Sequence, residues 1–236
     1  MIPIKDNIPT DRFPLVTFCL ILANVVVYVL AVAHGGSLFR GPDAHELVKY
    51  GVSPYQVTHP TGRTWETVFT AMFMHASILH IAGNMLFLWI FGNNVEDSMG
   101  RLRFLAFYVV GGLAALALQV AVGAGGSESV APTVGASGAI AAVLGGYVVL
   151  YPRARVLTLV LIIFFFTVIE IPVTVMLGLW FAMQAVFGAV GLTDPVGGGG
   201  GVAYFAHVGG FVFGLLAIRA LATRRKSVPP TAAAYR

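Results

Sequence analysis

Cysteine and charge are both scarce in this chain, and each shortage excludes a class of protein. The 236 residues contain a single cysteine, Cys19, which lies in an apolar run, so neither a disulfide framework nor a cysteine-based zinc site can be built. Only 10% of the residues are charged and 58% are hydrophobic, whereas soluble domains carry roughly 25% charged residues. With a mean hydropathy of +0.86, the composition predicts a polytopic membrane protein, and the length fits one compact domain.

Six apolar runs predict an all-α membrane protein, a six-transmembrane-helix bundle that occupies residues 13–222. Residues 1–12 form a short N-terminal tail, and residues 223–236 form a basic C-terminal tail. The first run ends in an Ala-x-Ala triplet like that of a signal peptide, but it exceeds the usual apolar core of roughly 7–15 residues, so we expect a retained helix. The spans are expected at about residues 13–33, 67–92, 101–122, 133–151, 171–190 and 202–222.

The segments between these spans differ in character. Residues 34–66 form the longest polar stretch, and their Tyr and Trp residues favour a structured loop at the membrane interface. Residues 93–97 are expected to form a charged turn. Residues 156–169 are too short for an ordinary span and predict an interfacial or half-buried segment that ends near Pro172. Residues 197–201 are five glycines, flexible by composition, and the glycine-rich loop at residues 191–201 that contains them is a candidate lid.

The basic residues predict the orientation of the bundle. With both termini in the cytoplasm, eleven Lys and Arg residues lie inside and three lie outside, which is the positive-inside pattern. This distribution accounts for the pI near 9.4 without a nucleic-acid partner. The three outer residues are Arg40, Lys49 and Arg63. The compact chain without a targeting segment favours a bacterial plasma membrane as its location.

A serine between small residues opens the fourth apolar run. Ser137 stands in the sequence Gly135-Ala136-Ser137-Gly138, where free backbone N–H groups and the helix dipole favour negative charge. This is the geometry of a nucleophile, with Gly135 and Gly138 allowing close approach of a substrate backbone. The alternative is that Ser137 is a small packing residue at a helix–helix contact, as is common in membrane bundles.

A serine nucleophile needs a base, and His207 is the best-placed candidate. It lies near the start of the last span, and it can meet Ser137 only if an odd number of crossings separates the two helices; we expect one, at residues 171–190. Asp194 is the nearest acidic residue and is more typical of a loop charge, so a Ser–His dyad is favoured over a triad. Small residues at helical spacing predict close contact of the two helices, namely Ala141, Gly145, Gly210 and Gly214.

The second span carries polar residues at membrane depth, which are costly there and are usually functional. His80 and Asn84 are four residues apart and share a helix face, and with the Ser137 N–H they can donate to one developing oxyanion. His75 is a candidate supporting residue. Interhelical hydrogen bonding for packing alone is the alternative. A metal site from His75, His80 and His207 is also conceivable, but the sequence has no H-E-x-x-H motif.

Taken together, these motifs resemble the rhomboid family of intramembrane serine proteases, over a stretch from about Trp65 to Gly214. The matching patterns are H-x-x-x-x-H-x-x-x-N from His75 to Asn84, G-x-S-G at residues 135–138, and A-H-x-x-G at residues 206–210. The resemblance implies Ser137 as nucleophile, His207 as general base, and His80, Asn84 and the Ser137 amide as the oxyanion hole. It implies no metal or cofactor. The implied substrates are single- or multi-span membrane proteins, cut near the outer end of a transmembrane helix within the lipid bilayer.

Two positions depart from the family pattern. Trp65 is followed by Glu66, where the family often has arginine, and Ala141 stands where some members place an aromatic residue against the histidine ring, so the imidazole must be held another way. The resemblance also makes the fifth helix a candidate lateral gate. Two alternatives remain: a non-proteolytic rhomboid-like protein that binds client helices, and a small transporter, for which the sequence shows no internal repeat.

Overall fold

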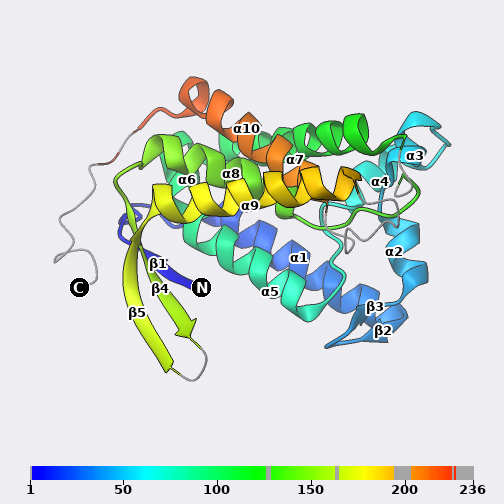
Figure 1. The fold of residues 1–236 in the computed structure, drawn as a ribbon, viewed down its shortest axis with the longest axis horizontal. Coiled ribbons are helices and arrows are strands. Elements are labelled where there is room, and N and C mark those ends of the chain that lie inside the picture. Colours follow the sequence, from blue (N-terminus) through cyan, green and yellow to red (C-terminus); the bar gives the residue numbers. More distant parts are fainter. Residues whose placement is uncertain (1, 126–128, 163–164, 194–202, 225, 227–236) are drawn as a thin grey trace.

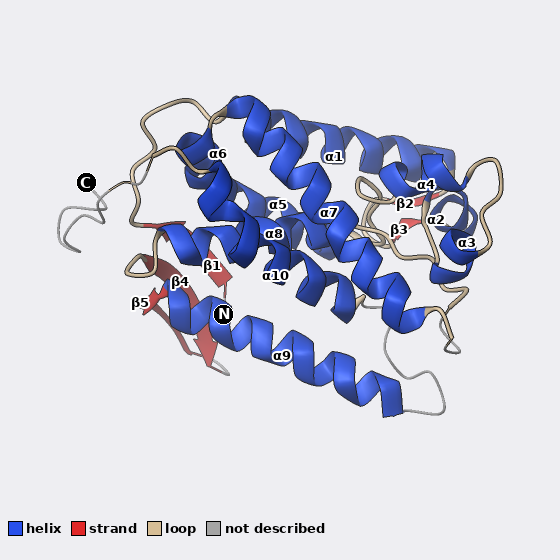
Figure 2. Cartoon of the chain, turned by 90° about the horizontal axis from the view of Figure 1, so that it is seen from above, coloured by secondary structure: helices blue, strands red, loops and turns tan. Residues whose placement is uncertain are grey.

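The fold is arranged around one short helix, α8 (Ser137–Leu150), in a computed structural model that describes residues 2–125, 129–162, 165–193, 203–224 and 226. Eleven of its fourteen residues are buried. Alanines and glycines make up much of its surface, which allows neighbouring helices to approach closely on several sides. Figure 2 shows α7 (Arg101–Gly123) and α10 (Tyr204–Leu221) packed beside it.

Within the described residues, five helices are long and apolar enough to cross a membrane. Three of them, α1 (Leu15–His34), α7 and α10, agree closely with the spans predicted from the sequence. The helix α9 (Val173–Thr193) agrees with the predicted fifth span and lies at the edge of the bundle in Figure 2. The chain is therefore a mostly helical, multi-pass membrane protein.

The second crossing begins later than predicted. After α4 (Thr64–Thr70) the chain turns, and Ser77 caps α5 (Ile78–Phe87) by accepting from the His80 N–H. A π-helical turn, η1 (Leu88–Gly92), and α6 (Asn93–Met99) extend the span, so the predicted charged turn at residues 93–97 is wrong. The acidic side chains are tolerated in the helix because they have partners. Glu96 accepts hydrogen bonds from the Val16 and Thr17 N–H groups at 3.0 and 2.8 Å, which gives two free backbone donors in the first turn of α1 an acceptor.

The fourth predicted span is shorter than expected. At 1.5 Å per residue, α8 is about 21 Å long, whereas a bilayer core is about 30 Å thick. The preceding residues are held in extended structure instead of helix. Thr133 pairs with Val52, and the Gly135 N–H donates to the Ala71 carbonyl at 2.8 Å.

A three-stranded antiparallel sheet corrects the all-α prediction. The hairpin of β4 (Arg155–Ile162) and β5 (Phe165–Pro172) contains the segment expected to be interfacial, and β1 (Ile2–Asp6) from the N-terminal tail pairs with β4. The hairpin is rich in β-branched and aromatic residues, which suit a pleated surface. Because Val156 and Thr158 are two apart and both buried, one face of β4 packs inward.

The two ends of the bundle differ in structure (Figure 1). The sheet and Lys226 lie at one end, where the Lys226 side chain donates to the Pro9 carbonyl and forms ion pairs with Asp11 and Asp97. The opposite end holds the structured loop expected at residues 34–66. Most of the candidate lid at residues 191–201 and most of the C-terminal tail fall outside the described residues. The loop elements are β2 (Gly36–Ser37), β3 (Gly41–Pro42), α2 (Ala44–Tyr50), α3 (Pro54–Thr58) and α4.

Candidate active site

Ser137 is the first residue of α8, as the sequence predicted. The turn before it depends on Gly135, whose φ of +126° is one that L side chains rarely adopt. A Cβ built on Gly135 would also lie 2.9 Å from the ring of His80. The helix has no side-chain cap, so the backbone N–H groups of its first turn are available to a ligand.

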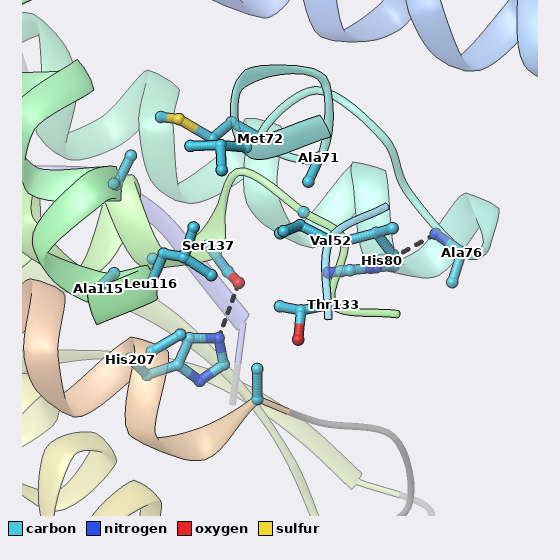
Figure 3. A pocket seen from close by; sticks show the side chains of 18 of the residues that line it. Val52, Ala71, Met72, Ala76, His80, Ala115, Leu116, Thr133, Ser137 and His207 are labelled. Atoms are coloured by element: carbon cyan, nitrogen blue, oxygen red, sulfur yellow. Dashed lines mark hydrogen bonds between the residues drawn. The ribbon is translucent and has the colours of Figure 1, made fainter. Parts of the chain in front are cut away.

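Ser137 and His207 are in direct contact. The Ser137 Oγ lies 2.7 Å from the His207 Nε2, and Figure 3 shows the hydroxyl and the imidazole facing each other. Since α9 is the one crossing between them, α8 and α10 run in the same direction and their first turns meet, as expected from the sequence. Backbone packing makes this possible: a Cβ on Gly210 or Gly214 would lie 2.1 or 2.0 Å from a carbonyl oxygen of α8.

The other nitrogen of the imidazole has a partner that the sequence reasoning missed. The His207 Nδ1 lies 2.8 Å from the Gln184 Oε1, and the Trp180 ring lies 5.7 Å from the imidazole, centroid to centroid. Both residues come from α9, four apart on one helix face. The sequence signal for this partner was a glutamine within an apolar span. Gln184 and Trp180 together hold the imidazole although Ala141 is not aromatic, because α9 supplies the contacts that α8 lacks.

Of the polar residues predicted on the second span, His80 lies nearest the serine and lines a cavity together with Ser137. Its Nδ1 accepts the Ala76 N–H at 3.4 Å, which leaves its Nε2 as the protonated nitrogen. His75 is fully buried just before α5, and its ring packs edge-on against His80 at 5.0 Å. Asn84 lies one turn further along α5, and its buried Nδ2 has no hydrogen-bond partner in the described part of the chain.

The cavity beside Ser137, His80 and His207 has a volume of about 400 Å³. Its walls are mainly apolar, and Ser137, His80 and His207 provide polar groups (Figure 3). A partly buried serine–imidazole contact beside free N–H donors and an apolar cavity is suited to acyl transfer from a peptide bond. The walls are formed by Val52, Val68, Ala71, Met72, Ala115 and Leu116, among others.

Other candidates from the sequence are not part of this arrangement. His75, His80 and His207 do not form a metal-ligand group, and the residues described contain no other such group of His, Cys, Asp or Glu. Glu66, the second departure from the family pattern, forms an exposed ion pair with Arg63 at 3.3 Å. Asp194 lies outside the described residues.

A family model described as the rhomboid domain matches residues 62–224, which cover more than half of the chain. The chain is 27% identical over 202 residues to the rat presenilin-associated rhomboid-like protein, mitochondrial, covering 83% of this chain and 46% of that protein. It is 29% identical over 210 residues to the rhomboid protease GluP of Bacillus subtilis, covering 88% of this chain and 35% of that protein. It is 31% identical over 101 residues to the rhomboid protease AarA of Providencia stuartii, covering 42% of this chain and 34% of that protein.

The chain therefore spans less than half of the length of the curated relatives it matches. Two of these relatives are bacterial proteins named as proteases, and several others are named as mitochondrial rhomboid-like proteins. The mitochondrial relatives do not fit the bacterial plasma membrane expected from the sequence. The location that the comparisons support is the coarser one, a membrane crossed several times.

Proposed function

The chain belongs to the rhomboid family, and on this premise we propose that it is an intramembrane serine endopeptidase. Ser137 is the nucleophile and His207 the general base. The observation that carries the proposal is the 2.7 Å contact between the Ser137 Oγ and the His207 Nε2, beside a cavity of about 400 Å³ at the starts of α8 and α10. A serine that only packs between helices does not require a histidine base at hydrogen-bond distance.

The proposed reaction is acyl transfer to the serine followed by hydrolysis. The Ser137 Oγ attacks the substrate carbonyl carbon while its proton passes to the His207 Nε2. The negative charge on the carbonyl oxygen is held by the Ser137 N–H, the His80 Nε2–H and the Asn84 amide, which is supported by the unpartnered Asn84 Nδ2. His207 then protonates the leaving amine, and water attacks the acyl-enzyme to release the second product.

The substrates proposed are single- or multi-span membrane proteins, cut near the outer end of a transmembrane helix. We also propose six spans within a membrane domain at residues 13–222, with α8 as the short fourth span. The segments that precede and follow this domain in the sequence both lie in the cytoplasm. This orientation places the basic residues at the sheet end inside and the cavity toward the outer face. Water then reaches Ser137 without crossing the membrane.

The test is cleavage of a model single-span substrate in liposomes by the wild type, Ser137→Ala and His207→Ala. Wild-type cleavage that both variants lose, by roughly a thousandfold or more, supports the dyad. Circular dichroism and thermal melting check that the variants are folded. If Ser137→Ala cuts as fast as the wild type, the proposal is wrong.

A second readout separates the protease from a non-proteolytic rhomboid-like protein that binds client helices. A fluorophosphonate labels only a serine activated by its base, so it reports on the site without needing the right substrate. Labelling of the wild type and not of Ser137→Ala supports the protease. A wild type that binds transmembrane peptides but is never labelled supports the client-binding alternative.

A further inference from the structure

We propose that Gln184 of α9 is a positioning residue that holds the His207 imidazole in the protonation and orientation its role as base requires. The inference rests on the proposed function. It assigns to a neutral amide the place that a carboxylate occupies in a Ser–His–Asp triad. The observation behind it is the 2.8 Å contact between the His207 Nδ1 and the Gln184 Oε1.

The argument starts from the proton on the imidazole. For the Ser137 hydroxyl to donate to Nε2, that nitrogen must carry its lone pair, so the single ring proton of the neutral imidazole is on Nδ1. The Nδ1–H is then a buried donor, and a buried donor without an acceptor is destabilising. The Gln184 carbonyl oxygen accepts it. Its contact therefore favours the one tautomer in which His207 can remove the serine proton.

The surroundings restrict the ring further. Gln184 is only 6% exposed, and Trp180, one turn earlier on α9, packs against the imidazole. Phe181 stacks on Phe211 of α10 at 4.6 Å, which fixes α9 against the helix that carries the base. The groups that contact or face His207 in the described residues are Ser137 from α8, Gln184 and Trp180 from α9, and His80 across the cavity.

A neutral partner also suits this depth in the bundle. A carboxylate in the same place would be a buried charge, which is costly unless it is paired. An amide oxygen accepts the same hydrogen bond without that cost. The chain can thus orient its base while keeping charge out of the span, since α9 has no acidic or basic residue between Val173 and Gly191.

The placement on α9 has a consequence for the reaction. Outward-facing residues of this helix, such as Leu179 and Met183, are exposed at the edge of the bundle. If α9 moves aside to admit a substrate helix, it takes Gln184 away from His207. The base is then fully oriented only when α9 has returned, so substrate entry and chemistry are separated in time.

The experiment compares three substitutions at this position by two rates. Gln184→Leu and Gln184→Met remove the acceptor, and Met keeps the length of the side chain. Gln184→Glu keeps an oxygen that only accepts. The matched control is Gln119→Leu, which removes a glutamine that accepts the Ala206 N–H at 3.1 Å and does not contact the imidazole. The two rates are cleavage of the model single-span substrate and labelling by a small fluorophosphonate.

We expect Gln184→Leu and Gln184→Met to lower kcat by roughly 10- to 100-fold, with KM nearly unchanged, because general-base catalysis contributes about 10²–10⁴ in rate. The labelling rate should fall by the same factor. Gln184→Glu should retain most of both rates, and Gln119→Leu should stay close to the wild type. A proton resonance from the hydrogen-bonded Nδ1–H should be present in the wild type and in Gln184→Glu, and absent from Gln184→Met.

Three outcomes would overturn the inference. If the fluorophosphonate labels Gln184→Leu and Gln184→Met as fast as the wild type, the base needs no partner on α9, and the proposed function stands. Loss of cleavage with normal labelling would assign Gln184 to substrate entry instead. If the folded wild type neither cuts nor labels, the proposed function is wrong and the inference is wrong with it.

Discussion

At the scale of single residues, the site is defined by polar atoms in an apolar setting. Ser137 and His207 satisfy each other, whereas Asn84 has a buried amide nitrogen without a partner in the described residues. An unsatisfied buried donor costs free energy in the resting protein. The cost is offset if the donor is used when a negative oxygen forms beside it.

Asn84→Ala should therefore lower kcat while leaving the fold intact. Removing one oxyanion donor typically costs about 10²–10³ in kcat, and we expect a loss in that range with KM changed little. Because no hydrogen bond of the Asn84 amide nitrogen is lost, the melting temperature should not fall by more than a few degrees. If Asn84→Ala keeps the full wild-type kcat, Asn84 is not part of the oxyanion hole.

At the scale of elements, the contact of α8 with α10 brings the serine and histidine together. The two helices meet through backbone, because glycines on α10 face carbonyl oxygens on α8. Because lipid tails are as apolar as the helix surfaces, dispersion and close packing hold such helices together. Any side chain added at this contact separates the helices and with them the dyad.

Gly214→Val tests this contact away from the reacting atoms. A Cβ at Gly214 would lie 2.0 Å from the Ala142 carbonyl oxygen, so α10 must shift. Overpacking of this kind costs about 1–3 kcal/mol, which a lower melting temperature in detergent would report, together with lost cleavage. Gly178→Ala is the matched control, since a Cβ there has nothing within 4 Å, and it should be neutral or slightly stabilising. Equal melting of the two variants would contradict the packing argument.

The mobility of α9 can be tested with a disulfide. A Cβ on Gly188 would lie 3.2 Å from the Tyr204 Cβ of α10, near the separation that a disulfide needs, so Gly188→Cys with Tyr204→Cys should crosslink in a Cys19→Ser background. If α9 is the gate, the oxidised protein should lose cleavage of the transmembrane substrate but keep fluorophosphonate labelling. Reduction should restore cleavage. Equal cleavage before and after reduction would rule out a gate that opens at this end of α9.

The motifs predicted from sequence are those carried by short, local patterns. Ser137 at a helix start, and the parallel run of α8 and α10, follow from glycines, helical spacing and the count of crossings. The beginning of α5 was missed although its cap, Ser77, is a local signal. Glu96 in the helix was missed because its partners lie on α1, and Gln184 was missed because its partner lies on α10. What the sequence could not reveal was the pairing of residues far apart along the chain.

At the scale of the whole molecule, the N-terminal strand is held against the bundle on the side of the sheet. Asp6, at the end of β1, accepts from the Asn94 Nδ2 at 2.8 Å and from the Tyr147 hydroxyl. The Asn7 side chain accepts the Arg155 N–H at 2.8 Å. The N-terminal strand thus links α6, α8 and the β4–β5 hairpin, and it places a carboxyl group inside the protein.

This carboxyl group should make stability depend on pH. Burial raises the pKa of Asp6 to about 6, above its ordinary value of 3.8, against the opposing hydrogen bonds from Tyr147 and Asn94. At a pH between these two pKa values, the Asp6 carboxyl keeps its proton in the folded chain and has released it in the unfolded chain. The free energy of unfolding should therefore fall as pH rises from about 4 to about 6, by an amount on the order of 2 kcal/mol.

Asp6→Asn separates this contribution from that of the other carboxyl groups. The variant has no proton to release, so the difference in melting temperature between it and the wild type should grow in favour of the variant as pH rises through this window. The measurement is a series of melts in detergent from pH 4 to pH 7. A constant difference across the series would show that Asp6 does not titrate on unfolding.

The short, buried α8 also bears on how the protein is made. A helix of fourteen residues, several of them glycine, is a poor substrate for independent insertion into a bilayer during synthesis. Its burial depends on α7, which is made before it, and on α10, which is made after it. Ser137 and His207 thus meet only once α10 has been made. A nascent chain holds its serine without its base, and under the proposed function it has no hydrolytic activity until assembly is finished.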